Sequence, residues 1–283
     1  MRNDLYTITT LSNLHVGSGD INFDIIDNQV QRDAITGLPT IHSSSLKGAL
    51  REASEESNYI NYIFGADNKA KEAQAGAFHF FEASLLARPV RSNKKPYFMA
   101  TSVGVIENFL TFLEDFKISI DEKLKSALEA LSKVKVQEGK PLIFETLDNV
   151  ILEDFEAGVN GLTVSALEPF LGKNLALFAD ADFKALSLPV LARNYLEDGV
   201  SKNLWYEEVV PKKSKFYFAI AKPTNLDEGI YDRAYASDDE IAKLTNLDEA
   251  DKKKKRFNSS THVQFGANKS IGYGYSKVEK VSL

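Results

Sequence analysis

The chain has 283 residues, of which 43% are hydrophobic and 26% are charged, and it contains no cysteine. This length suffices for one large domain or for a core with substantial insertions. The lack of cysteine excludes disulfides, thiolate nucleophiles and cysteine-based zinc sites, so any metal must bind to oxygen or imidazole ligands. The formal net charge of -6 disfavours a protein that coats nucleic acid indiscriminately, because affinity for phosphates comes from clustered Lys and Arg.

The hydropathy pattern indicates where in the cell the protein is expected to reside. No apolar run approaches the roughly 20 residues that a membrane-spanning helix needs. Residues Met1–Thr7 lack the apolar stretch of a secretory signal. We therefore expect a cytoplasmic protein without a membrane partner.

The first fifty residues predict a strand, a glycine loop and a helix. Residues 5–11 are short, alternating and rich in β-branched side chains, which is typical of a strand, and they run into His15–Gly19. A glycine loop lets the backbone approach a phosphate closely. Ser43, Ser44 or Ser45 can cap the helix that follows, and its Lys47 and Arg51 lie one turn apart, where they offer contacts to an anion.

The remainder mixes strands and helices without a strict βαβα rhythm, which indicates an α+β sheet with helices on one face. No internal repeat or low-complexity linker interrupts it, so we expect a single domain over residues 1–283. Apolar spacing and turn residues predict the following elements: a strand over 76–83 leading into a loop that carries Arg88 and Arg91, helices over 103–116, 124–131 and 165–178, an extended hairpin between 186 and 222, a short helix over 238–244, and closing strands over 261–265 and 273–278.

Asp27 is the carboxylate with the most favourable setting for chemistry. It follows an apolar pair and precedes polar residues beside a flexible loop, where a carboxylate can deprotonate a hydroxyl or bind a divalent ion. Spacing alone leaves open a structural role, in which Asp27 caps a turn or pairs with Arg32. Asp20, Asp24 and Asp33 are rivals that composition does not rank.

His15 and the aromatic residues near the expected hairpin each allow a functional and a structural interpretation. His15 beside the glycine loop can donate to a phosphate or shuttle a proton, but a lone histidine at a strand end is more often structural. The aromatic residues at 205–206 and 216–218 stand near Lys212 and Lys213 and can stack on bases, although aromatic residues on strands usually fill the core. The basic run at 252–256 is most simply a solvated surface.

Taken in order, these segments resemble the RAMP backbone subunits of type III-B CRISPR effectors, the Cmr complexes. The resemblance covers nearly the whole chain. It rests on the following motifs: His15–Gly19, Asp27 with Gln31-Arg32, Gly37–Pro39, Ser44–Gly48, Gly76–Phe78, Leu85–Ser92, Asn203–Glu208 and Ile271–Gly274.

The resemblance implies a fold and a set of partners. The fold is a ferredoxin-like, RRM-type palm with a helical insertion at approximately 100–180 and a β-hairpin thumb at approximately 186–222. Copies of the chain stack in a helical filament along a guide crRNA, together with other Cmr subunits that include a large Cas10-type subunit. Each thumb displaces one nucleotide of the duplex between the guide and a single-stranded target RNA.

The resemblance also implies an activity, namely cleavage of the target RNA that depends on a divalent metal ion, Mg²⁺ or Mn²⁺, bound through Asp27. We expect Asp27 and His15 to be the catalytic residues. The alternatives are a guide-binding scaffold without activity, a guide-processing ribonuclease and a type III-A homologue. The residues expected to contact RNA are Gly17, Ser18, Gly19, Ser44, Ser45, Lys47, Arg51, Arg88, Arg91, Gly272 and Gly274.

Overall fold

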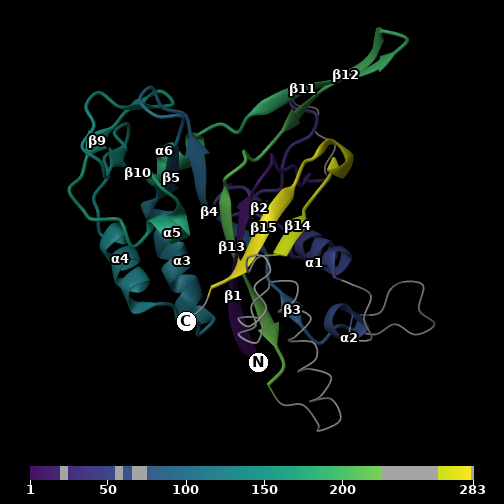
Figure 1. Cartoon of the computed structure of the whole chain (residues 1–283), viewed down its shortest axis with the longest axis horizontal. Coiled ribbons are helices and arrows are strands. Elements are labelled where there is room, and N and C mark those ends of the chain that lie inside the picture. Colours follow the sequence, from purple (N-terminus) through teal and green to yellow (C-terminus); the bar gives the residue numbers. More distant parts are fainter. Residues whose placement is uncertain (20–24, 55–59, 66–74, 225–260, 282–283) are drawn as a thin grey trace, which may run out of the picture.

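A sheet of eleven strands forms the centre of the protein in a computed structural model, which describes residues 1–19, 25–54, 60–65, 75–224 and 261–281 (Figure 1). The main strand order is β14-β15-β1-β13-β4-β5-β10-β6-β9, with β2 paired to β4 and β3 paired to β13. The strands are β1 (Arg2–Thr10), β2 (Thr40–Ile41), β3 (His79–Phe80), β4 (Ala83–Val90), β5 (Phe98–Ser102), β6 (Leu142–Ile143), β7 (Ile151–Leu152), β8 (Phe155–Glu156), β9 (Gly158–Val159), β10 (Leu175–Phe178), β11 (Val190–Glu197), β12 (Val200–Glu208), β13 (Lys215–Lys222), β14 (Thr261–Gln264) and β15 (Tyr275–Lys280). The helices are α1 (Ser43–Ala53), α2 (Ile60–Phe64), α3 (Val103–Asp115), α4 (Glu122–Ser132), α5 (Glu168–Leu171), α6 (Asp180–Ala185) and the 3₁₀ helix η2 (Lys269–Ile271).

The topology around β13 is a split β-α-β unit. Strands β1 and β4 flank β13 and both run antiparallel to it, so they are parallel to each other, and α1 lies in the connection between them. This arrangement is the ferredoxin-like unit. It confirms the expected α+β class.

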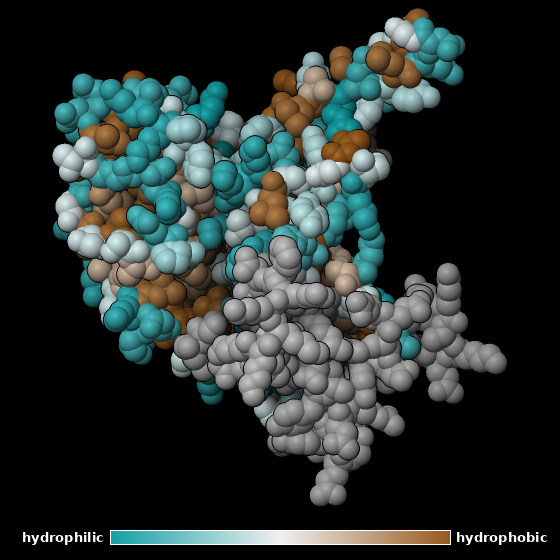
Figure 2. Space-filling model, viewed as in Figure 1, coloured by the Kyte–Doolittle hydropathy of each residue, from teal (hydrophilic) through white to brown (hydrophobic). Residues whose placement is uncertain are grey.

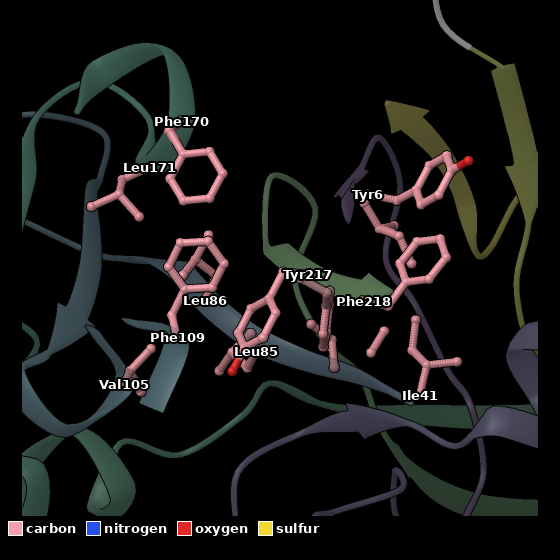
Figure 3. Close-up of a cluster of buried hydrophobic side chains, with 14 of the residues drawn as sticks. Tyr6, Ile41, Leu85, Leu86, Val105, Phe109, Phe170, Leu171, Tyr217 and Phe218 are labelled. Carbon is pink, nitrogen blue, oxygen red and sulfur yellow. The ribbon is translucent and has the colours of Figure 1, made fainter. Parts of the chain in front are cut away.

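Both faces of the central sheet are covered, which explains the nearly continuous apolar sequence of β13. On one face, the ring of Tyr217 lies 4.7 Å from that of Phe109 in α3. On the other face, Phe218 stacks on Tyr6 at 5.3 Å. Figure 3 shows these two groups pointing away from the sheet in opposite directions.

Helices α3 and α4 confirm two of the predicted helices, whereas the prediction of a helix over 165–178 is wrong. Only α5 forms there, and Gly172, whose φ of 108° lies in the left-handed region, ends it. The apolar run after it, β10, is fully buried and pairs in parallel with β5. A short apolar run of this kind does not distinguish a buried strand from a helix by periodicity.

Strands β11 and β12 form a separate two-stranded hairpin that projects from the body of the protein (Figure 1). Asp198 and Gly199, with φ of 51° and 77°, make its turn, as expected of a two-residue hairpin loop. Brown patches line the projection in Figure 2, and Leu196, Val200 and Leu204 are each more than half exposed. Strand β13 belongs to the central sheet, and the division into palm, insertion and thumb stays a prediction.

The predicted strand at the N-terminus and the closing strands are confirmed as β1, β14 and β15. The expected helix over 238–244 and the basic run at 252–256 lie outside the described residues. Within the described ranges, no helix is long and apolar enough to span a membrane.

A buried ion cluster lies at the end of the sheet where β1 begins. Asp4 Oδ2 lies 3.0 Å from both Lys222 Nζ and Lys280 Nζ. Burial disfavours the charged form of Asp4, but the two ammonium groups outweigh this effect and lower the pKa of the carboxyl group.

Replacing Asp4 with Asn should lower the free energy of unfolding at pH 7 by about 3 kcal/mol, because it removes the carboxylate that Lys222 and Lys280 both contact. A carboxyl group with a lowered folded-state pKa stabilises the protein above its unfolded pKa of about 3.9, and this contribution is lost as the pH falls through the folded value. Urea unfolding of both proteins at pH 7 and at steps below about pH 4 measures the difference, which should shrink at the acidic end. A difference that does not change with pH would contradict this account.

Candidate functional site

Two adjacent carboxylates at the root of β12 are buried, Glu207 at 4% and Glu208 at 5% relative exposure. Arg32 Nη2 lies 2.5 Å from Glu208 Oε1, and Val30 N donates to Glu208 Oε2 at 3.1 Å. A buried charge is tolerated only when it is paired and hydrogen-bonded. The segment around residues 30–32 is therefore held against the hairpin root.

Glu207 contacts other parts of the chain than Glu208 does. Arg193 Nη1 on β11 lies 3.2 Å from Glu207 Oε2, and Asn268 Nδ2 donates to Glu207 Oε1 at 2.7 Å. The guanidinium of Arg193 also lies over the rings of Trp205 and Tyr273, at 5.9 and 5.5 Å from their centroids. Glu207 thus ties the hairpin to the loop between β14 and β15.

Asp27 lies on a loop that docks on the same root. Its Oδ2 accepts a hydrogen bond from Tyr206 N at 2.7 Å. The neighbouring Asn28 N donates to Tyr206 O at 3.1 Å, and Glu208 N donates to Asn28 O at 2.9 Å. The Asp27 side chain remains exposed, so a carboxylate of fixed position faces solvent beside the hairpin.

Asp33, a rival candidate, has a local structural role. Its Oδ1 accepts hydrogen bonds from Ile35 N, Thr36 N and Thr36 Oγ1. Burial works against the ionised form of Asp33, yet these hydrogen bonds prevail and lower its pKa. The other rivals, Asp20 and Asp24, lie outside the described residues.

His15 is buried beneath the glycine loop, at 5% relative exposure. Its Nδ1 is 2.7 Å from the carbonyl oxygen of Glu208, its Nε2 is 3.8 Å from Glu207 Oε1, and its own carbonyl accepts from Ala267 N at 2.9 Å. A Cβ on Gly17 would come within 3.2 Å of the His15 ring. These contacts favour a structural role, and catalysis by His15 stays a prediction.

The two glycine loops meet around His15. Gly17 pairs with Val30, and Ser18 N donates to Gln29 O at 3.0 Å, while Gly19, with φ of 82°, is exposed. On the other loop, a Cβ on Gly266 would come within 2.1 Å of the carbonyl oxygen of His15. The absence of a side chain at Gly266 is what allows the second loop to approach.

Helix α1 begins differently from the prediction. His42 occupies its N-cap position without a side-chain cap, so the expected capping by a serine is wrong. Instead, Gln31 Oε1 accepts from His42 N at 2.8 Å and Gln31 Nε2 donates to Ser45 Oγ at 3.1 Å. Ser44 is exposed in the first turn and Lys47 is half-buried. Gln31 thereby joins the Asp27 segment to α1.

The three arginines expected to contact RNA are all engaged within the chain. Arg51 Nη1 donates to Gly65 O at 2.6 Å, and Arg91 Nη2 lies 2.7 Å from Glu153 Oε2. Arg88 lies within β4 rather than in the expected loop, and it is buried. Burial lowers the pKa of Arg88 to about 10. Of the three side chains, only that of Arg91 is largely exposed, at 88%.

The sequence pattern places Glu207 and Glu208 at the end of the Asn203–Glu208 motif without indicating their role, and it does not indicate Arg193 or Asn268 as site residues. Two consecutive glutamates usually indicate a solvated strand end. Successive residues of a strand point to opposite faces, so the sequence does indicate one carboxylate on each face of a strand that borders the two glycine loops.

The described residues contain no cluster of three or more His, Asp or Glu side chains that could hold a metal ion. Mg²⁺ is commonly bound through one or two carboxylates together with water and substrate phosphates. Asp27, a single exposed carboxylate, fits this type of site.

Two glycines of the second loop make a matched pair of variants. Gly274 has φ of 72°, and a Cβ there would lie 1.8 Å from Phe265 O, whereas Gly272 has φ of 82° and open space around it. Gly272→Ala should cost only the left-handed strain of about 1–2 kcal/mol, while Gly274→Ala should cost clearly more because backbone must move. Denaturant unfolding measures how much unfolding free energy each variant loses. Equal losses in the two variants would contradict this prediction.

Comparison with known proteins gives three findings. The sequence profile of the RAMP superfamily matches residues 7–278. The CRISPR system Cmr endoribonuclease Cmr4 of Pyrococcus furiosus is 29% identical over an alignment 303 residues long. The alignment covers 98% of this chain and 95% of that protein. Two solved structures share the fold over nearly the whole of both chains.

The crystal structure of oligomeric Cmr4 from Pyrococcus furiosus superposes with a TM-score of 0.69 at 25% identity and covers 100% of each chain. The cryo-EM structure of the type III-B Cmr-beta bound to cognate target RNA gives a TM-score of 0.72 at 24% identity, over 99% of this chain and 98% of that one. Because the superfamily profile spans nearly all of the sequence and the fold agrees, this chain belongs to the RAMP superfamily.

Proposed function

We propose that this chain is the backbone subunit of a type III-B CRISPR effector and that it cleaves the target RNA paired with the guide. The observation that carries the proposal is the position of Asp27, an exposed carboxylate fixed by the backbone of Tyr206 at the root of a projecting hairpin. The similarity to a protein named as a Cmr endoribonuclease supports the activity. The similarity to a Cmr structure bound to target RNA supports the substrate.

The proposed reaction is attack by a ribose 2′-hydroxyl on the adjacent phosphorus. The bond from the 2′-oxygen to phosphorus forms and the bond from phosphorus to the 5′-oxygen breaks, which leaves a cyclic phosphate and a 5′-hydroxyl. Asp27 takes the proton from the 2′-hydroxyl, or it would hold a metal ion while that proton passes to water, and the leaving 5′-oxygen takes a proton from water. A divalent ion, Mg²⁺ or Mn²⁺, supplies charge stabilisation at the phosphate when bound, and Asp27 is the residue that would hold it.

The hairpin contributes geometry. A regular duplex keeps the 2′-oxygen out of line with the leaving oxygen, so a nucleotide must be displaced before attack. Holding the reacting atoms in line can contribute about 7–11 kcal/mol, whereas one general base gives roughly 100-fold to 10,000-fold. Alignment by the hairpin is therefore the larger effect, and Asp27 acts on a nucleotide that is already positioned.

We infer that the guide crRNA is held through its backbone rather than through its sequence. The glycine loops, the start of α1 and the Arg91 region would supply these contacts, since they include the exposed residues Gly19, Gly272, Ser44 and Arg91. Arg88 would contribute indirectly, because its buried guanidinium fixes the connection to β11. Further copies of this chain and other Cmr subunits, including the large Cas10-type one, are the proposed partners in the cytoplasm.

Asp27→Asn tests the activity. The Asn carbonyl oxygen can still accept from Tyr206 N, so the loop should keep its position while the negative charge is lost. We expect regularly spaced, metal-dependent products from assembled wild-type complexes and at least a 100-fold lower rate from the variant, with target affinity nearly unchanged. Cleavage of a labelled target RNA with Mg²⁺, with Mn²⁺ and with chelator measures this.

Asp33→Asn is the matched control, since it removes a carboxylate of the same loop region that is occupied by turn hydrogen bonds. It should cleave like the wild type. If complexes with Asp27→Asn gave the same products as the wild type, the proposal would be wrong in its catalytic part, and a guide-binding scaffold would describe the chain better.

A further inference from the structure

A cavity of about 650 Å³ lies between β4, the lobe that contains β7 and β8, and the root of the hairpin. Figure 1 shows the connection from α6 to β11 crossing from this lobe to the hairpin. Pro189 and Pro211, which flank the hairpin in sequence, line the cavity. The volume falls in the range of roughly 300–1,000 Å³ that is typical of ligand pockets.

The walls combine aromatic and apolar side chains with polar groups. Tyr97 and Phe155 line the cavity, together with Leu188. Aromatic rings of this kind are the surfaces on which unpaired bases stack in proteins that bind single strands, at roughly 1–3 kcal/mol per base. The exposed Asp154 adds a hydrogen-bond acceptor to the lining.

The buried Arg88 also lines the cavity. Its Nη1 and Nη2 donate to the carbonyls of Leu186 and Ser187 at 3.0 and 2.6 Å. Its Nε has no hydrogen-bond partner among the described residues, although it is buried. A polar atom buried without a partner is uncommon and costs free energy. The lining is therefore a polar and aromatic surface rather than a simple packing defect.

Cations and carboxylates both lie at the cavity. The Arg91 side chain is 88% exposed and pairs with Glu153, which also lines the cavity, while Lys213 Nζ lies 5.3 Å from the centroid of the Tyr97 ring. The lysine is exposed on the turn between β12 and β13. Arg88, Arg91 and Lys213 together exceed Glu153 and Asp154 by one positive charge. An aromatic pocket with this excess suits a nucleotide, whose base is flat and apolar on its faces and whose phosphate is negative.

We propose that this cavity receives an unpaired RNA nucleobase, with Tyr97 and Phe155 against the base and with Arg91 and Lys213 near its phosphates. The proposal rests on the proposed function and deepens it, because a nucleotide displaced by the hairpin would lie beside the cavity. An apolar side chain from a second copy of the chain is the competing occupant. The excess of one positive charge at the cavity favours RNA.

Two alanines of α6 provide a matched test. Ala185 is exposed and lines the cavity, whereas Ala181 is exposed on the same helix and does not line it. Ala185→Trp should fill the cavity, and Ala181→Trp should leave it open. Complexes are assembled with guide or target RNA that carries a photoreactive 4-thiouridine, stepped through successive positions, and the crosslinked peptides are identified by mass spectrometry.

We expect crosslinks to the peptides that contain Tyr97 or Phe155 at regularly recurring positions. Their yield should fall about tenfold in Ala185→Trp and stay near the wild-type level in Ala181→Trp. Tyr97→Leu, which keeps apolar bulk and removes the ring, should lower the yield at Phe155 by a similar factor. This second variant keeps the test decisive if the tryptophan variant does not assemble.

Equal crosslink yields in the two tryptophan variants would overturn the proposal, as would crosslinks confined to β11 and β12. A loss of self-association by Ala185→Trp in sedimentation without RNA would assign the cavity to a second copy instead. The same complexes are assayed for cleavage. Cleavage that depends on Asp27 without crosslinks in the cavity would reject only the base site, whereas crosslinks without cleavage would support the site and reject the proposed activity.

Discussion

The burial of Glu207 and Glu208 at the root of β12 is the constraint on which the rest of the site depends. Removing two adjacent carboxylates from water is costly unless each finds a cation and hydrogen bonds. Arg32 pairs with Glu208, whereas Arg193 pairs with Glu207 and Asn268 donates a hydrogen bond to it. Successive strand residues point to opposite faces, so a slip of one residue would exchange the two partner sets. The pair therefore fixes the hairpin register and brings three distant segments together.

This arrangement separates the residues that support the site from Asp27, its proposed reactive group. His15 and Gln31 are buried and hydrogen-bond to backbone groups, and Gly266 closely approaches the backbone of His15. The Asp27 carboxylate accepts a hydrogen bond from Tyr206 N and is exposed, so it remains open to a ligand. A site of this kind keeps its carboxylate in position before the substrate arrives, so little ordering remains to be done on binding.

The sequence predicts those features that depend on local pattern and fails where tertiary pairing decides. The Asp198-Gly199 turn and the amphipathic spacing of α3 act locally, and both were predictable. The burial of β10 depends on its parallel pairing with β5, which no local pattern encodes. Likewise, Arg88 and Arg91 are three residues apart and identical in type, yet Arg88, within β4, is buried, whereas Arg91, after the end of that strand, is exposed.

The internal pairing of cations also bears on how a chain of net charge -6 can hold RNA. Arg32, Arg51, Arg88 and Arg193 all bind groups of the chain itself, so they add little to phosphate affinity. A single copy of this acidic chain then relies on backbone amides and exposed lysines, and we expect its own affinity for RNA to be low. In the proposed filament, neighbouring copies on one guide raise the effective concentration of each successive contact. The acidic composition therefore favours binding that is tight only when copies are stacked in register, which is the arrangement that places each hairpin at a regular interval along the duplex.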